Sequence, residues 1–450
     1  MKKNIFITAL LSLAISFTSC ESFLADGINV DQNKPSTVPV NAQMPHIAIN
    51  IANVYGGDIS RFATMLSQQV EGVARQWSSF NQYTGLSPFR FDTAWSNCYE
   101  NVLIEVQAMI NSANEDGYAH YSAAGKTLEA FMLLTMTDLW GDIPYSEAIS
   151  GFENINPTFD SRTGVIYPRV MSLLDEAASG FNASSGGKDL GSDDVIYGGN
   201  VSAWKKAVNA IKARAYLHKG DYNSALSNAK ASFSSRADNF SFKFTNDDPA
   251  NWWNFNNDRT GDIEFHPTLR GMMEGLNDTA RLAILDQTFI TSHPYLSADY
   301  DQGLVTYREM QFVIAETLHR TGGSAAEIET AYLNGIKASF EEVGATTADY
   351  EAYVAQASVN PGAGNIKLEE HILTQKYIGL FVDPEVFNDL RRNSFPKLDP
   401  VSGSTLPTRF QYSSDELLFN TNSPADGATT LFTPTPVSYT HLTLPTKRIV

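Results

Sequence analysis

The feature that most constrains this chain is a helical apolar repeat that glycine interrupts. Between residues 204 and 215, apolar side chains recur at intervals of three and four residues, which places them on one face of a helix. Gly220 and Asp221 break this pattern, and a second stripe rich in alanine runs from Tyr222 to Ala229. Small residues on facing helices allow close approach, so the segment predicts a helix-turn-helix pair.

A second helix-turn-helix pair is predicted at residues 307–340, where Gly322 and Gly323 form the break. We expect Ser324 to cap the next helix and Glu327 to complete a capping box, because the first amides of a helix need acceptors. Further helices are predicted at residues 120–139 and 165–181. The spacing of both pairs resembles the tetratricopeptide repeat. We therefore expect a mostly α fold built on a tetratricopeptide-like helix-turn-helix scaffold.

Two long segments lack this periodicity. Residues 238–267 are dense in Asn, Asp and aromatic side chains, and residues 394–436 are rich in Pro, Ser, Thr and Asn. Long loops inside a compact protein are more often functional surfaces than idle connections. We predict that these segments form a loop-rich layer interleaved in sequence with the helical scaffold.

Composition excludes one class of function. The chain has 450 residues, of which 43% are hydrophobic, so it can bury a large core. Its 50 acidic residues outnumber its 32 basic ones, which gives a formal charge of −18. Binding to nucleic-acid phosphates relies on clustered Lys and Arg, so we expect no nucleic-acid partner.

The first twenty residues predict the compartment. Two lysines precede an apolar run from Ile5 to Phe17, and small residues then lead to Cys20. The run is shorter than the roughly 20 apolar residues that cross a bilayer, which favours a secretory leader. Its end resembles a bacterial lipoprotein box. We expect residues 1–19 to be a signal peptide and Cys20 to carry the lipid that anchors the chain to a membrane.

The chain has two cysteines, and lipidation of Cys20 leaves only one free thiol. An intramolecular disulfide is therefore excluded. That thiol, Cys98, lies in an apolar-periodic stretch with no His near it in sequence. We interpret it as a small buried hydrophobe, because a nucleophilic cysteine needs a paired base.

A set of spaced motifs covers nearly all of the mature chain. The most specific follows a predicted helix and reads DLWGDIPYSEA from Asp138 to Ala148. The others are residues 157–160, 204–229, 306–320 and 375–398. Together, and in this order, they resemble the SusD/RagB family of outer-membrane nutrient-binding lipoproteins. One departure is residues 277–281, which read NDTAR where members often read Asn-Asp-Pro-Arg.

This resemblance implies a single SusD-like nutrient-binding domain at residues 20–436. It implies a lipid-anchored protein of the outer membrane that faces the cell exterior. Such a protein would capture a nutrient, such as an oligosaccharide or polysaccharide, and pass it to a TonB-dependent SusC-like barrel.

Residues 437–450 are expected to be non-native. The sequence VSYTHLTLPT resembles an in-frame translation of the transposon adapter used in sequencing libraries, and KRIV would continue the read-through. The alternative is a real terminal strand that Pro445 ends.

Catalytic motifs are few. Asp138 and Asp142 are four residues apart and could form a glycosidase acid and base pair, but Gly141 and Pro144 favour a tight helix exit in which Asp accepts backbone amides. The sequence has no Gly-x-Ser-x-Gly elbow, no His-Glu-x-x-His and no phosphate-binding glycine loop. Its eight His residues show no metal-binding spacing. We assign no catalytic residue, no metal and no cofactor.

Two sets of aromatic residues are better candidates for a binding site. A sugar ring presents apolar C–H faces and hydroxyl groups, so glycan sites combine an aromatic platform with polar side chains at its edge. One set lies in a predicted loop after a helix, and the other lies among Asn and Asp side chains. The candidate ligand-binding residues are Trp77, Phe80, Tyr83, Trp252, Trp253, Phe255, Asn257 and Arg259. The alternative for each set is packing, since large aromatics are usually buried.

Two classes of function remain open. The first is a non-catalytic surface lipoprotein that binds glycans or related nutrients, with a binder of peptides as its variant. The second is a surface-anchored helical glycoside hydrolase that uses Asp138 and Asp142 or another carboxylate pair.

Overall fold

The computed structural model describes residues 38–149, 154–286, 293–425 and 430–435. The expected signal peptide, the expected lipid site at Cys20 and the expected non-native segment 437–450 lie outside these residues.

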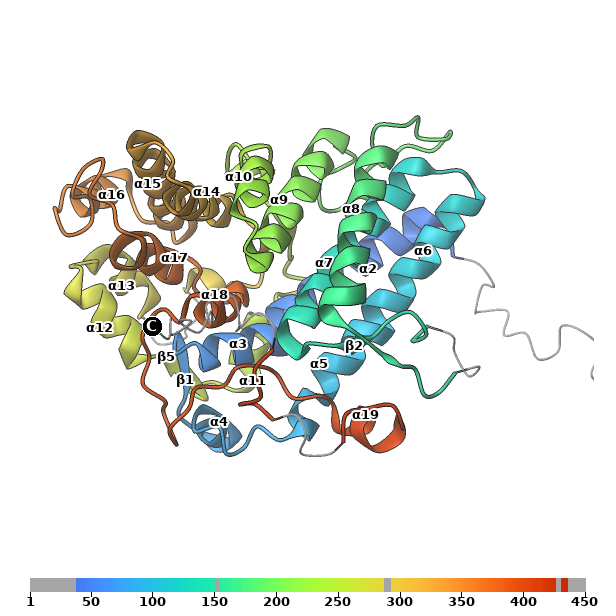
Figure 1. Cartoon of the computed structure of the whole chain (residues 1–450), viewed down its shortest axis with the longest axis horizontal. Coiled ribbons are helices and arrows are strands. Elements are labelled where there is room, and N and C mark those ends of the chain that lie inside the picture. Colours follow the sequence, from blue (N-terminus) through green and yellow to red (C-terminus); the bar gives the residue numbers. More distant parts are fainter. Residues whose placement is uncertain (1–37, 150–153, 287–292, 426–429, 436–450) are drawn as a thin grey trace, which may run out of the picture.

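One layer of the molecule is a row of helices packed side by side, which crosses the top of Figure 1 from right to left. Each helix packs on the next, and α10 packs directly on α14 although a long segment separates them in sequence. The row consists of α6 (Ile104–Glu115), α7 (Ala119–Trp140), α8 (Tyr167–Gly180), α9 (Val201–Lys219), α10 (Tyr222–Lys230), α14 (Tyr307–Thr321), α15 (Ala325–Glu342) and α16 (Thr347–Val354). The predicted mostly α scaffold of helix-turn-helix pairs is confirmed.

The turns inside the two predicted pairs use glycine as expected. Gly220 after α9 and Gly322 after α14 adopt left-handed conformations with φ of 76° and 74°, which residues with a Cβ rarely adopt. The predicted capping box at Ser324 is wrong, because the Ser324 side chain makes no capping bond. The carboxylate of Glu327 instead accepts from Nζ of Lys230 on α10 at 2.8 Å.

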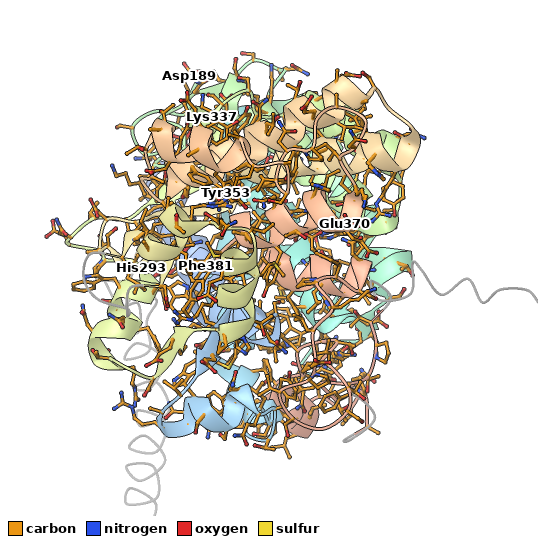
Figure 2. The ribbon with its side chains drawn as sticks, turned by 90° about the vertical axis from the view of Figure 1, so that its left-hand side faces the viewer. Asp189, His293, Lys337, Tyr353, Glu370 and Phe381 are labelled. Carbon is orange, nitrogen blue, oxygen red and sulfur yellow. The ribbon has the colours of Figure 1, made fainter. Side chains whose placement is uncertain are left out.

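The second layer lies below this row in Figure 1 and is built from short elements and loops. Its helices are α3 (Ser60–Leu66), α4 (Arg75–Asn81), α5 (Asp92–Asn97), α11 (Asn251–Asp258), α12 (Pro267–Gly275), α13 (Thr279–Leu285), α17 (Thr374–Gly379), α18 (Glu385–Asn393) and α19 (Ser414–Phe419). The long N-terminal helix α2 (Val40–Val54) packs on α6 and α7. Among the described residues, antiparallel pairing joins β1 (Val70–Gly72) with β5 (Ile263–Phe265), β2 (Ile143–Pro144) with β3 (Phe159–Asp160), and β4 (Phe240–Lys243) with β6 (Asp301–Val305). Side chains fill the space between the layers (Figure 2). One example is His293, which lies beside Phe381 with the two ring centroids 6.0 Å apart.

The prediction that residues 238–267 are irregular is wrong in part, because β4, α11 and β5 lie within them. Both strands are short and pair with strands far away in sequence, so local periodicity does not reveal them. The predicted loop around Trp77 is likewise the helix α4. Residues 394–425 do follow the prediction, apart from the short helix α19.

A buried ionic cluster connects the two layers. The imidazole of His218 on α9 lies between two carboxylates, with Nδ1 2.7 Å from Oδ2 of Asp138 on α7 and Nε2 2.6 Å from Oε1 of Glu385 on α18. Nη2 of Arg162 contacts the other oxygen of Asp138 at 2.6 Å. His218 is fully buried and both carboxylates are 1% exposed. Buried charges are tolerated when they are paired in this way.

The pKa values follow from this geometry. Burial opposes the charge of His218, but Glu385 and Asp138 raise its pKa to about 9. Burial also opposes the charges of the carboxylates, yet His218 and its cationic neighbours lower the pKa of Glu385 to about 2 and hold that of Asp138 well below its usual range. The cluster is therefore an imidazolium between two carboxylates at neutral pH.

We predict that alkaline pH destabilises the fold through His218. Its pKa is raised from 6.5 to about 9 on folding, so its stabilisation is complete below pH 6.5 and is lost as the pH rises towards 9. His218→Gln should lower the free energy of unfolding at neutral pH by about 3–5 kcal/mol, because it leaves two carboxylates buried without their cation.

Denaturant unfolding at pH 6.5 and pH 9 measures both effects. His46→Gln is the matched control, since His46 is exposed on α2. Equal stability of the unmodified chain at the two pH values, or equal stability of the two variants, would contradict the prediction.

Candidate ligand-binding face

The pairing of β1 with β5 brings the two predicted aromatic sets together. Strand β1 ends just before α4, which carries Trp77 and Phe80, and β5 begins just after α11, which carries Trp252 and Phe255. In the β1–β5 register Val70 lies opposite Phe265. A salt bridge closes the junction, because Nε of Arg75 contacts Oδ1 of Asp262 at 2.6 Å.

The two sets share one aromatic cluster, in which Phe255 alone of the rings named below is partly exposed. The rings of Trp77 and Phe255 meet edge to face with centroids 5.0 Å apart, and Phe62 of α3 packs against both Trp77 and Phe80. Nε1 of Trp252 donates to Oγ of Ser60 at 2.9 Å. Trp77, Phe80 and Trp252 are only 4%, 3% and 1% exposed, so protein atoms cover their faces. Rings covered in this way cannot act as an open platform for a sugar.

Tyr83 supports a loop. The Tyr83 hydroxyl accepts from the backbone amide of Val401 at 3.2 Å, and its buried ring packs edge to face against Phe432. Tyr83 therefore helps to fix the position of the segment 394–408.

The accessible part of the predicted site comprises Trp253 and Asn257 on one side of α11 and Phe255 and Arg259 on another, and we name these four residues the α11 edge. Trp253 and Phe255 are partly exposed, and Asn257 and Arg259 are exposed. Ligand binding by the eight residues stays a prediction, but among them this edge offers ring, amide and guanidinium groups to solvent.

A cation fixes the ring of Phe255 from the inner side. The guanidinium of Arg61 lies 4.6 Å from the Phe255 ring centroid, and its Nη2 contacts Asp58 Oδ1 at 2.7 Å. Nη1 of Arg61 donates to Oδ1 of Asn251 at 2.6 Å, which ties α11 to α3. No pattern in the sequence indicates that Arg61 belongs to this arrangement. The spacing of Trp252 and Phe255, three residues apart on one helix, could have indicated that they pack inward together.

Asp138 and Asp142 are not arranged as an acid and base pair. Asp138 is buried and held ionised by His218 and Arg162, so it has no proton to donate to a leaving group. Oδ1 of Asp142 accepts the backbone amide of Arg162 at 2.8 Å, as expected for a polar helix exit. Gly141 ends α7 with φ of 90°.

Other chemistry of the described residues is limited. In this part of the chain, His, Cys, Asp and Glu do not gather in any group of three or more suited to a metal ion. Cys98 is fully buried, as predicted, and burial raises the pKa of its thiol. Within the described ranges, every helix is too short or too polar to cross a membrane.

Solved structures share this architecture. A SusD/RagB family protein from Bacteroides thetaiotaomicron matches with a TM-score of 0.68 at 20% identity, over 86% of this chain and 95% of that one. A SusD homologue from Bacteroides fragilis matches with a TM-score of 0.71 at 20% identity, over 89% and 99%. A chitin-binding protein matches with a TM-score of 0.68 at 21% identity, over 85% and 94%. At these identities the likeness establishes the helical SusD-like fold. A search among curated proteins finds no match.

The family follows from the sequence match. The model of a SusD-like family described as "Starch-binding associating with outer membrane" matches residues 32–293 and 284–413. This chain belongs to the SusD-like family, which confirms the resemblance read from its motifs.

We predict that the two neighbouring tryptophans of α11 differ in their structural cost. Trp252→Ala should lower the free energy of unfolding by about 3–5 kcal/mol, because it empties a buried site. Trp253→Ala should cost clearly less, because Trp253 is partly exposed. Thermal and denaturant unfolding of both variants measures the difference, and equal losses of stability would show that burial does not distinguish them.

Proposed function

We propose that this protein is a non-catalytic cell-surface lipoprotein that captures glycans or related nutrients. Membership of the SusD-like family carries this proposal, because the description of that family names starch binding and the outer membrane. The structural likeness to a chitin-binding protein supports a carbohydrate ligand.

The α11 edge is the proposed ligand-binding face. Trp77 and Arg61 both contact the ring of Phe255 and fix its position. The ring would therefore not need to reorganise when a ligand binds. Arg259 follows Phe255 by one helical turn, and Asn257 lies between them in sequence. Both are exposed and supply a guanidinium and an amide, which suit sugar hydroxyl groups.

The absence of catalysis is part of the proposal. Asp138 is committed to a buried ionic cluster and Asp142 to a backbone amide, which leaves the pair unsuited to glycoside hydrolysis. If the protein were a hydrolase, another pair of carboxylates would have to act as its acid and base.

The membrane attachment and the partner extend the proposal beyond the described residues. Residues 1–19 would be removed and Cys20 lipidated, and residues 20–436 would form one SusD-like domain facing the cell exterior. The captured nutrient would pass to a TonB-dependent SusC-like barrel in the outer membrane. Residues 437–450 would be foreign to the natural protein.

Binding at the α11 edge is tested by affinity electrophoresis of residues 21–436 through gels that contain starch, chitin derivatives or other polysaccharides. We predict retardation by at least one polysaccharide, and a loss of affinity of about tenfold or more in Phe255→Ala and Asn257→Ala. Phe419→Ala is the control, because this exposed ring lies on α19 and not on the α11 edge.

Retardation that neither α11 variant changes would contradict the proposed face. If no polysaccharide retards the protein and a pool of peptides binds to it instead, the result would favour the alternative in which this SusD-like protein binds peptides. Release of sugars from a retarding polysaccharide would contradict the non-catalytic role.

The anchor predicts a separate result. Cys20→Ala should remove the full-length protein from the outer-membrane fraction, because about 0.8 kcal/mol per buried methylene group is then lost. Cell fractionation that separates inner and outer membranes, with immunoblotting, measures this, and retention of the variant in the outer-membrane fraction would contradict lipidation as the anchor.

A further inference from the structure

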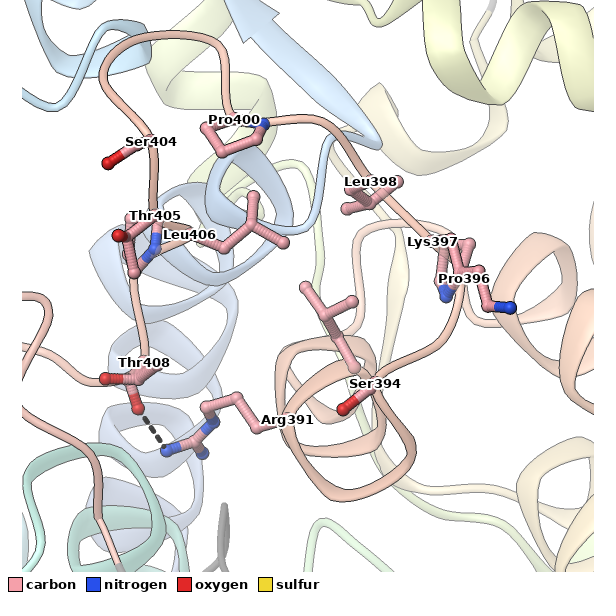
Figure 3. A pocket seen from close by; sticks show the side chains of 12 residues that line it. Arg391, Ser394, Pro396, Lys397, Leu398, Pro400, Ser404, Thr405, Leu406 and Thr408 are labelled. Carbon is pink, nitrogen blue, oxygen red and sulfur yellow. Dashed lines mark hydrogen bonds between the residues drawn. The ribbon is translucent and has the colours of Figure 1, made fainter.

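The segment 394–408 curves around a pocket of about 520 Å³ (Figure 3). One wall is the end of α18, which contributes Leu390 and Arg391, and the rest comes from the segment itself. A volume of this size is typical of sites for small molecules.

The pocket is preformed, because several bonds hold its loop in place. The Gln68 side chain donates to the carbonyl of Asp399 at 2.6 Å, and Tyr83 accepts from the amide of Val401. At the far end, the amide of Thr408 donates to the carbonyl of Leu431 at 2.6 Å. A loop fixed at its middle and its end loses little conformational entropy when a ligand binds.

The pocket has an aliphatic part formed by leucine and proline side chains, and serine, threonine and two basic side chains complete its lining. Figure 3 shows Leu398 and Leu406 projecting from the loop towards the space, with Pro400 above them. Leu406 is only partly buried and is not a member of the hydrophobic core clusters of the described chain. None of the residues that line the pocket is aromatic, so it lacks the flat platform that sugar rings use.

The charge of the pocket is opposite to that of the whole chain. Its lining includes Arg391 and Lys397 and no acidic residue, although the chain carries a formal charge of −18. Lys397 is exposed and forms no salt bridge with the described residues.

Arg391 at the base is a buried cation surrounded by neutral acceptors. Within the described chain it donates to the carbonyls of Phe387, Thr408 and Asp138 and to the side chains of Asn388 and Thr435. No carboxylate of the described residues pairs with it, and burial lowers its pKa to about 10 against the attraction of more distant acids.

The next residue shows the contrast. The guanidinium of Arg392 contacts Glu316 at 2.5 Å and Asp389 at 2.7 Å, and these carboxylates raise its pKa above the usual value. Among the described residues, therefore, Arg392 has carboxylate partners and Arg391 has none, and Arg391 lies where the pocket opens.

We propose that this pocket binds an aliphatic carboxylate, with its hydrocarbon part against Leu398 and Leu406 and its carboxylate towards Arg391. The carboxylate would share or replace the Thr408 carbonyl and the Thr435 hydroxyl as acceptors for Nη1. Two sources carry this chemistry, namely a fatty acyl chain and the C-terminal aliphatic residue of a peptide. The inference is independent of glycan binding at the α11 edge, since the two sites share none of their residues.

Isothermal titration calorimetry with sodium octanoate and with N-acetyl-leucine tests the proposal, with octan-1-ol and N-acetyl-leucinamide as their neutral counterparts. We expect at least one of the two acids to bind with one-to-one stoichiometry. Its neutral counterpart should bind with an affinity that is weaker by about tenfold or more. Binding of octanoate alone identifies the acyl source, and binding of N-acetyl-leucine alone identifies the peptide source.

The variants place the site. Leu406→Ser should weaken binding of the acid by about tenfold or more, because a hydroxyl replaces the aliphatic contact. Val401→Ser should leave the affinity unchanged, because Val401 is exposed in the same loop but does not line the pocket. The proposal is overturned if neither acid binds, if the neutral counterpart binds equally well, or if Leu406→Ser binds as the unmodified chain does.

Discussion

A protonated histidine buried between two carboxylates holds this molecule together. His218 is separated from Asp138 by 80 residues and from Glu385 by 167, yet all three meet without access to solvent. Removing any one partner would leave an uncompensated charge in a medium that stabilises charges poorly. The positions of α7, α9 and α18 are thus coupled, and so are the layers to which they belong.

The coupling extends from this cluster towards both surfaces. Nε of Arg214 on α9 contacts Glu309 on α14 at 2.8 Å, which continues the ionic contacts along the helical row. In the other direction, Nη2 of Arg391 donates to the carbonyl of Asp138 at 2.7 Å and leads to the segment 394–408. Tyr83 connects that segment to α4 and the aromatic cluster beneath the α11 edge. A rigid helical row can therefore present short, irregular elements in fixed positions, which suits a protein that binds a ligand on its loops.

The sequence was a good guide wherever the determining interactions are local. The 3.6-residue periodicity of residues 204–229 and the glycine at 220 predicted α9, its turn and α10, because one helix face and one left-handed residue decide that structure. The strands β1 and β5 could not be predicted in this way, since each is three residues long and depends on a partner almost 200 residues away. For the proposed site, the sequence indicated two aromatic sets that the fold brings together, but it could not tell Trp252 from Trp253, because which face of α11 is covered depends on α3 and α4. Arg61 and Arg391 carry no sequence signal, since their importance comes only from what surrounds them after folding.

Hydrogen–deuterium exchange of the chain with and without starch and chitin oligosaccharides tests the central claim most directly, because it reports which segments a ligand covers. The account predicts slower exchange in residues 251–262, around the α11 edge, and in the adjoining residues 75–83, with little change in the helical row. Slower exchange confined to other segments, or no change with any glycan that binds, would contradict the claim that this family member captures its nutrient on the α11 edge.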